Sequence, residues 1–262
     1  MNEKHLIRND LSVLVPQYPS NFFYKKLAFT LAETLITLGI IGVVAALTLP
    51  SVINKTQKRA LEVAFKKSYA NLYNAVNLVK QDSPDYLEDG SVSSNPMLGN
   101  LILEKYKSHD LAIKNSRDYD NYTNNVRTLT LNQGIRPECS QLFYPNYSYN
   151  LSDGSTIAFM RNCNSVWITL DTNGIQKKPN AYGHDIFLFM ITAKGDFMPA
   201  ASEVGMITNE NGEKVYDTNN PEHNEKCSKT ATSALNGITC GKYAIQNVCP
   251  DNPSKTYWEC LQ

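Results

Sequence analysis

The chain lacks the signals that mark most enzymes and nucleic-acid-binding proteins. Its 25 Lys and Arg residues balance 25 Asp and Glu residues, so no basic field points to a nucleic acid. It contains no internal repeat and no G-x-S-x-G, H-E-x-x-H or P-loop sequence. Asp153, Ser155 and His184 are of catalytic types, but a serine beside a turn is usually a turn residue. We therefore expect a non-enzymatic protein without a direct nucleic-acid site.

One long apolar segment near the N-terminus stands out against this background. Phe29 to Leu49 contains 21 residues, and Glu33 is its only ionisable side chain. As a helix it rises about 31 Å, which matches the hydrocarbon core of a bilayer. Lys25 and Lys26 precede it, as the positive-inside rule expects of a cytoplasmic flank. The sequence therefore predicts a single membrane span.

Glu33 is the unusual residue of this segment. A carboxylate in hydrocarbon is costly, and such residues are usually functional. The cost is smaller near a helix start, where the helix dipole favours a negative charge. The simpler interpretation is that the side chain extends to the membrane interface.

The residues around Glu33 follow a specific order that favours the functional interpretation. Lys25-Lys26-Leu27-Ala28 precedes Phe29-Thr30-Leu31-Ala32-Glu33, and the apolar run then ends at Pro50. This order resembles the class III signal of type IV pilins and type II secretion pseudopilins, and it covers about 50 residues. The family usually has Gly where Ala28 stands, although Ala is also small.

The resemblance implies how the segment is processed and what it contacts. A prepilin peptidase would cut between Ala28 and Phe29 and methylate the new N-terminus. Glu33 and Pro50 then become the fifth and twenty-second mature residues, where the family places them. The ammonium of Phe29 in one subunit would pair with Glu33 of a neighbour, which lowers the cost of the buried charge and sets the register.

The resemblance also implies partners and a location. The partners are the prepilin peptidase, other pilin-like subunits in a homo- or hetero-filament, and membrane lipids. The location is the bacterial cytoplasmic (inner) membrane, with a single pass and the head outside the cytoplasm. The filament is a type IV pilus, a type II secretion filament or a DNA-uptake filament, since all three share this N-terminal chemistry.

A rival interpretation treats the same segment as an ordinary secretory signal. Val44-Ala45-Ala46 resembles a small-residue cleavage site after an apolar region. Cleavage there would release a soluble ligand-binding protein, and an uncut segment would leave a monomeric anchored one. Against cleavage after Ala46, the helical pattern continues through the site and Glu33 has no role.

The rest of the chain predicts an α+β fold, with a long N-terminal helix packed on a small antiparallel sheet. The expected segments are a leader (1–28), a membrane and assembly helix (29–50), an amphipathic helix (51–82) and a globular head with a disulfide-rich C-terminal part (83–262). Apolar residues between 52 and 79 recur at three- and four-residue steps, and Pro50 is expected to kink the helix. A second helix is expected at 97–107. Strands are expected at 126–131, 147–151, 156–161, 166–170 and 186–192, and a loop at 208–233.

Six cysteines follow the apolar segment: Cys139, Cys163, Cys227, Cys240, Cys249 and Cys260. No two have the Cys-x-x-Cys spacing of a zinc site. An even number outside the cytoplasm favours disulfides, and six cysteines allow 15 connectivities. Sequence neighbours suggest the pairs 139–163, 227–240 and 249–260. Free buried thiols are the alternative.

One segment of the head carries hard oxygen donors on a glycine-rich turn. Asp171, Asn173 and Asp185 lie in LDTNGIQKKPNAYGHDIF and are candidate ligands for Ca²⁺. The segment is not an EF-hand, because Tyr182 stands where the bidentate Glu belongs. It resembles the D-x-N-G…P-N…G-x-D-x-F segment of some pseudopilin-like heads. The alternative is a plain Asn-Gly turn whose aspartates accept hydrogen bonds from loop amides.

Overall fold

The computed structural model describes residues 30–84, 97–107, 109–113, 115–134, 148–162, 165–191, 195–200, 206–208, 214–216 and 227–261. The chain divides into two compact units, one up to Pro50 and one from Ser51 onward. Each unit is described by itself below. The predicted cleavage residues Ala28 and Phe29, and the predicted pair Cys139 and Cys163, lie outside the described residues.

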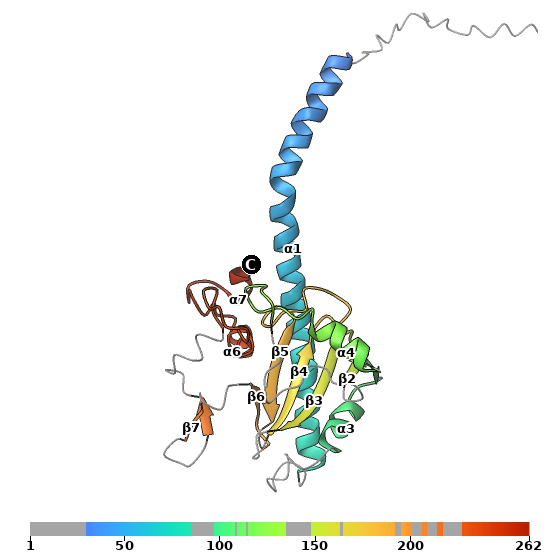
Figure 1. The fold of residues 1–262 in the computed structure, drawn as a ribbon, viewed down its shortest axis with the longest axis vertical. Helices are drawn as coiled ribbons and strands as arrows, with labels where there is room; N and C mark the ends of the chain where they lie inside the picture. The colour runs from blue at the N-terminus through green and yellow to red at the C-terminus, as the bar shows by residue number, and fades with distance from the viewer. Residues whose placement is uncertain are drawn as a thin grey trace, which may run out of the picture. The chain divides into compact units, whose positions relative to one another are not determined.

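The predicted long helix is confirmed as α1 (Leu31–Asp82), which Figure 1 shows. Pro50 lies inside it. Thr30 begins the helix with a capping box, in which Thr30 Oγ1 accepts from the Glu33 N–H (3.2 Å) and Glu33 Oε2 accepts from the Thr30 N–H (2.9 Å). At the other end Ser83 N–H still donates to the Val79 carbonyl (2.8 Å), and Pro84 has no N–H with which to continue.

The head contains a six-stranded antiparallel sheet whose strands lie in chain order, β1-β2-β3-β4-β5-β6. The strands are β1 (His109–Leu111), β2 (Ser148–Leu151), β3 (Thr156–Asn162), β4 (Ser165–Asp171), β5 (Ile186–Ile191) and β6 (Phe197–Pro199). The predicted α+β class, the antiparallel sheet and four of the five predicted strands are thereby confirmed. The predicted turn at 152–154 joins β2 to β3, where Gly154 adopts a positive φ of 89°.

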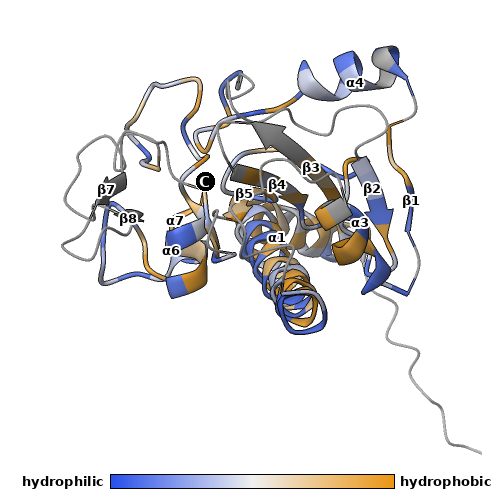
Figure 2. Ribbon diagram, turned by 90° about the horizontal axis from the view of Figure 1, so that it is seen from below, coloured by the Kyte–Doolittle hydropathy of each residue, from blue (hydrophilic) through white to orange (hydrophobic). Residues whose placement is uncertain are grey.

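Both faces of this sheet are covered, and the period-2 alternation of each strand decides which residue meets which layer. On β4, Ile168 faces the core shared with α1, whereas Trp167 belongs to the core of the opposite face. On β5, Phe189 and Leu188 divide in the same way. Figure 2 shows α1 beneath one side of the sheet and α4 on the other. The sequence predicted only the first of these layers.

The second half of α1 packs on its face through buried residues at helical spacing. Phe65, Leu72, Val76 and Val79 are each at most 1% exposed. The Phe65 ring lies 4.4 Å from that of Phe187 on β5, centroid to centroid. The predicted amphipathic helix is thus confirmed, and its apolar stripe is the main wall of the core.

Smaller elements complete the head: α3 (Met97–Glu104), α4 (Ser116–Thr123), α6 (Gly241–Gln246), α7 (Tyr257–Cys260) and the paired strands β7 (Met206–Thr208) and β8 (Lys214–Tyr216). The second predicted helix is confirmed as α3. The strand predicted at 126–131 is wrong: the segment forms turns, and Arg127 makes isolated bridges to Gln133 and Ala181. The loop predicted at 208–233 is interrupted by the β7–β8 pair.

Candidate functional site

The described part of the first unit, residues 30–50, is an apolar helical segment that no other described residue covers. Every residue from Thr30 to Pro50 is exposed. Within the described part of the chain, α1 is the one helix long and apolar enough to cross a membrane, on length and composition. Its first half therefore presents a continuous apolar surface that water would not solvate well.

Three threonine hydroxyl groups in the described part of this unit are satisfied inside the helix. Thr34 Oγ1 donates to the Leu31 carbonyl (2.8 Å), and Thr37 Oγ1 donates to the Glu33 carbonyl (2.9 Å). Thr48 Oγ1 donates to the Val44 carbonyl (2.9 Å). Because hydroxyls that bond to the preceding turn need no outside partner, these threonines add little cost in hydrocarbon.

Glu33 is held at the start of the helix by Thr30. Its Oε2 accepts from both the N–H and the hydroxyl of Thr30, each at 2.9 Å. This T-x-x-E capping box was not predicted, although its spacing is present in the sequence. The carboxylate therefore has partners within its own subunit. Its predicted partner, the Phe29 amine of a neighbour, lies outside the described residues and stays a prediction.

The loop between β4 and β5 contains the three candidate Ca²⁺ ligands. Asp171 ends β4 and Asp185 directly precedes β5, so the paired strands bring both to the same end of the sheet. Both aspartates are completely buried. Asn173 follows two residues after Asp171 and is partly exposed.

The aspartate oxygens in this loop already accept hydrogen bonds. Asp171 Oδ1 accepts from the N–H groups of Asn173 (3.2 Å) and Gly174 (2.8 Å). Asp185 accepts from the N–H groups of Asn180 (2.8 Å, Oδ2) and Ala181 (2.7 Å, Oδ1). These are the contacts that the alternative interpretation of the sequence expects, in which the aspartates accept hydrogen bonds from loop amides.

Tyr122 on α4 completes the surroundings of Asp171, since its hydroxyl lies 3.4 Å from Asp171 Oδ2. No sequence signal pointed to this contact, because the two residues are 49 positions apart. Burial, followed by the charge of Asp185, raises the pKa of Asp171 well above its usual range. Burial raises the pKa of Asp185 to about 7. Near neutral pH the pair therefore carries less than two full negative charges, which weakens its attraction for a cation.

Two amide oxygens in the loop favour the ion instead. Asn173 Oδ1 and Asn180 Oδ1 are buried and lack a hydrogen-bond partner within the described ranges. Such oxygens are suitable Ca²⁺ ligands. In the same ranges, however, no three His, Cys, Asp or Glu side chains gather as a metal site would require. Calcium at this loop stays a prediction.

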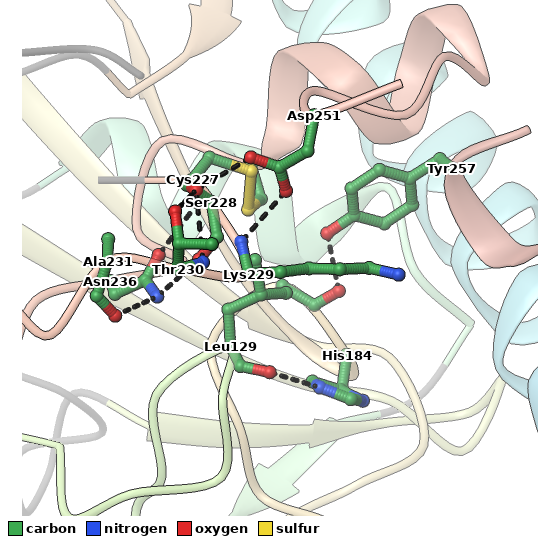
Figure 3. The surroundings of a disulfide bond; sticks show 12 residues. Leu129, His184, Cys227, Ser228, Lys229, Thr230, Ala231, Asn236, Asp251 and Tyr257 are labelled. Carbon is green, nitrogen blue, oxygen red and sulfur yellow. Dashed lines mark hydrogen bonds between the residues drawn. A yellow bond between two sulfur atoms is a disulfide. The ribbon is translucent and has the colours of Figure 1, made fainter. Parts of the chain in front are cut away.

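Two of the three predicted disulfides are confirmed in the C-terminal part of the head. Cys227 pairs with Cys240, and Cys249 pairs with Cys260. Figure 3 shows the first pair beside Asn236, whose side-chain Nδ2–H donates to the Ser228 carbonyl (2.7 Å). Asp251 accepts from the Ser228 hydroxyl (2.6 Å), which joins the two disulfide-bonded segments.

Asp153, Ser155 and His184 do not form a catalytic relay. Ser155 Oγ donates to Asp153 Oδ1 (2.5 Å), which is the contact of a turn. His184 Nε2 lies 2.9 Å from the Leu129 carbonyl, and both residues appear in Figure 3. Burial lowers the pKa of His184, so the ring is neutral near neutral pH. The serine and histidine therefore have separate structural partners.

Comparisons of the chain with protein-family models, with curated proteins and with solved structures found no match. The similarity of residues 25–50 to a pilin signal therefore stands on its own sequence features. Function is inferred below from the residues and their geometry.

Removing the second disulfide should destabilise the head. Cys249→Ser together with Cys260→Ser should lower the free energy of unfolding by roughly 3 kcal/mol. The reason is that the unfolded chain gains the conformational entropy that the cross-link removes. The measurement is denaturant unfolding of the full chain in detergent. Cys227→Ser with Cys240→Ser removes the other disulfide, which has a similar sequence separation, and should have a similar effect. Six free thiols in the unfolded, unreduced chain would contradict both pairs.

Thermal melting of the full chain in EDTA and in Ca²⁺ separates the two interpretations of the β4–β5 loop. A millimolar site would stabilise the fold by about 1 kcal/mol at about 5 mM Ca²⁺, or roughly 2–4 °C. Because the aspartates already accept hydrogen bonds, we expect the two melting temperatures to agree within about 1 °C. A calcium-dependent rise that Asp171→Ala and Asp185→Ala both abolish would establish the ion instead.

Proposed function

We propose that this chain is a pilin-like subunit that is stored in the membrane and polymerises through its N-terminal helix. The filament is a type IV pilus, a type II secretion filament or a DNA-uptake filament. The observation that carries the proposal is the described part of the first unit, residues 30–50: an exposed apolar helix whose only acid, Glu33, lies one turn from its start. A prepilin-like signal precedes that acid in the sequence.

The magnitude of the exposed apolar surface supports this proposal over a soluble monomer. Ten large apolar side chains between residues 31 and 49 are at least 54% exposed: Leu31, Leu35, Ile36, Leu38, Ile40, Ile41, Val43, Val44, Leu47 and Leu49. Burying such a side chain is worth about 1.5–3 kcal/mol. Their sum matches or exceeds the whole stability of a typical domain, about 5–15 kcal/mol. The segment therefore requires lipid before assembly and neighbouring subunits after it.

The helix surface also offers a place for a neighbouring side chain. Ile36, Gly39, Ile40, Val43 and Val44 line a shallow apolar groove. A Cβ atom added at Gly39 would meet no heavy atom within 4 Å, so the groove is open. Small residues let apolar helices approach closely, which suits a bundle of such helices.

The capping box gives Glu33 a defined role in both states. In the isolated subunit Thr30 supplies two donors to the carboxylate, which lowers the cost of keeping it at the edge of the bilayer. In the filament the cleaved and methylated Phe29 amine of the next subunit would add a positive charge. A charge pair inside an apolar bundle opposes every other axial register, because a shifted subunit would leave both charges unpaired.

The disulfides support an orientation with the head outside the cytoplasm. Disulfides persist in oxidising compartments and are rare in the cytosol. The head contains Cys227–Cys240 and Cys249–Cys260, whereas Lys25 and Lys26 precede the apolar segment. Positive residues on the cytoplasmic side and disulfides on the other side describe a single pass through the bacterial cytoplasmic membrane.

Processing tests the proposal directly. Coexpression with a prepilin peptidase should remove the 28-residue leader, about 3 kDa, and leave Phe29 as an N-methylated first residue. Ala28→Arg should block this cut, because a bulky charge replaces the small residue before it. Ala46→Leu is the matched control, since a large residue at that position would block an ordinary signal peptidase while the span stays apolar. A mature chain that begins at Leu47 would support secretion, and an intact Met1 a simple anchor.

Removal of the Glu33 charge should separate insertion from assembly. Glu33→Val should still insert into the membrane, since the run becomes more apolar. Filament yield in a producing strain should fall by about tenfold or more, because the Phe29 amine loses its partner. Ala32→Val places the same valine side chain at the adjacent position without a change of charge and should assemble normally. Wild-type filament yield from Glu33→Val would refute the pairing.

A further inference from the structure

The head contains a pocket that none of the preceding arguments uses. Its volume is about 590 Å³, which is large enough for a small-molecule or lipid-headgroup ligand. One wall is the part of α1 from Asn54 to Lys67. The others are the β2–β3 turn at Asp153, the β4–β5 loop and Leu131. The pocket lies entirely within the second unit of the chain.

The pocket is strongly positive. Lys58, Lys67, Lys177 and Lys178 line it, against Asp153 as its one acid. The Asp153 carboxylate accepts from the Ser155 hydroxyl and from the Asn71 amide (2.8 Å), and the Lys67 ammonium donates to the Asp153 backbone carbonyl (2.7 Å). One carboxylate offsets one of the four lysine charges and leaves three in excess. Lys58, Lys177 and Lys178 form no ion pair with any residue that the structure describes. The pocket is therefore complementary in charge to an anion.

Lys58 shows that this charge is concentrated. Burial and then the nearby ammonium of Lys229 lower the pKa of Lys58. An anion bound beside Lys58 would relieve both the lost solvation and the repulsion. Thr172 contributes a neutral donor: the residue is only 4% exposed, and its hydroxyl has no partner in the part of the chain that the structure describes. A phosphate oxygen is a suitable acceptor for the hydrogen bond that this hydroxyl can donate.

The remaining lining is apolar. Ala60, Leu61 and Ala64 of α1 face the pocket together with Leu131 and Leu261. Leu131 is 43% exposed, which leaves a large apolar side chain at the mouth. A free phosphate would use the lysines and leave these carbons uncovered. A ligand with a phosphate and an attached hydrocarbon would use both.

The position of the pocket in the sequence indicates which such ligand is at hand. Asn54 and Lys58 follow Pro50 by four and eight residues, or about 6 Å and 12 Å of helix rise. If the apolar run spans the bilayer, this stretch of α1 emerges at the depth of the phospholipid headgroups. Basic residues just outside a membrane span are attracted to anionic lipid.

We propose that this lysine-lined pocket binds the headgroup phosphate of an anionic phospholipid, with the headgroup carbons beyond the phosphate against Ala60, Leu61 and Ala64, which lie farther along α1 from the apolar run than Lys58. The lysine ammonium groups and the Thr172 hydroxyl hold the phosphate. The inference rests on the proposed function only in taking the apolar run as a membrane span. Its consequence is a subunit whose head is held at the membrane surface before assembly.

Native mass spectrometry of the full chain in an uncharged detergent tests this inference. The probes are dioleoyl phosphatidylglycerol and dioleoyl phosphatidylcholine, which share acyl chains and differ in charge. We expect the wild type to retain the anionic lipid about tenfold more than the zwitterionic one. Lys58→Gln with Lys67→Gln should abolish that preference. Ala60→Trp, an exposed helix position that fills the pocket without a change of charge, should abolish it too.

The matched control is Lys55→Gln with Lys66→Gln. It removes the same charge from the same stretch of α1, but neither residue lines the pocket, so the preference should remain. Equal anionic-lipid binding by all variants, or none by the wild type, would overturn the proposal. So would displacement of the lipid by about 10 mM inorganic phosphate but not by sodium chloride of equal ionic strength, since that result describes a site for soluble phosphate.

This test can fail independently of the proposed function. Lipid retention is measured on the purified subunit and needs neither a peptidase nor a filament. N-terminal sequencing of the chain coexpressed with a prepilin peptidase reports processing at Phe29 separately. A processed chain without lipid preference would refute the pocket alone, and an unprocessed chain with the preference would refute the filament role alone.

Discussion

The contact between the second half of α1 and strands β4 and β5 is the interaction on which the rest of the head depends. Phe65 is its centre: its ring lies 4.4 Å from Phe187 and 5.5 Å from Trp258, centroid to centroid. Because Trp258 belongs to α7, the same aromatic cluster ties the disulfide-bonded C-terminal segment to the sheet and to the helix. Loss of this cluster would separate three parts of the head at once.

The second face of the sheet depends on contacts that lie far apart in the sequence. Trp167 and Leu188 point away from α1 and pack with Tyr119 and Tyr122 of α4. The sequence of α4, SRDYDNYT, is polar and has no apolar stripe apart from these two tyrosines. Its helical state is therefore decided by the sheet that it covers, since intrinsic propensity is weak for such residues. This is why sequence reasoning predicted one covering layer and missed the other.

Where the sequence signals were local, prediction succeeded. The short apolar runs of β3 to β5, the Gly154 turn and the amphipathic stripe of α1 are each encoded within a few residues. The error at 126–131 has a physical cause. The N–H groups of Arg127 and Leu129 donate to the backbone carbonyls of Asn180 and Asn236 instead of to a neighbouring strand. The segment therefore connects two loops by hydrogen bonds. The Cys227–Cys240 and Cys249–Cys260 pairs were predicted because the partners are neighbours among the cysteines in the sequence. Both pairs close short loops, of 13 and 11 residues in sequence separation.

The β4–β5 loop illustrates why a ligand motif and a structural motif look alike in sequence. Acidic and amide side chains on a glycine-rich turn are suited both to a cation and to backbone N–H groups. Asp171 and Asp185 each receive two N–H donors in the structure. A pair of buried carboxyls at raised pKa can keep a loop closed by hydrogen bonds while carrying little net charge. Spacing alone does not distinguish these cases, because it gives neither burial nor direction.

The apolar side chains of α1 have different surroundings before and after Pro50. After Pro50 the apolar positions are buried within the same molecule, so substitutions such as those at Leu72 or Val76 act on the stability of the head. Before Pro50 the apolar side chains have no partner within the described part of the chain, so their energy is realised only with lipid or with another subunit. In the proposed filament, changes in the first half would therefore alter assembly without unfolding the head. The lysine-lined pocket begins four residues after that boundary, at the place in the sequence where one environment gives way to the other.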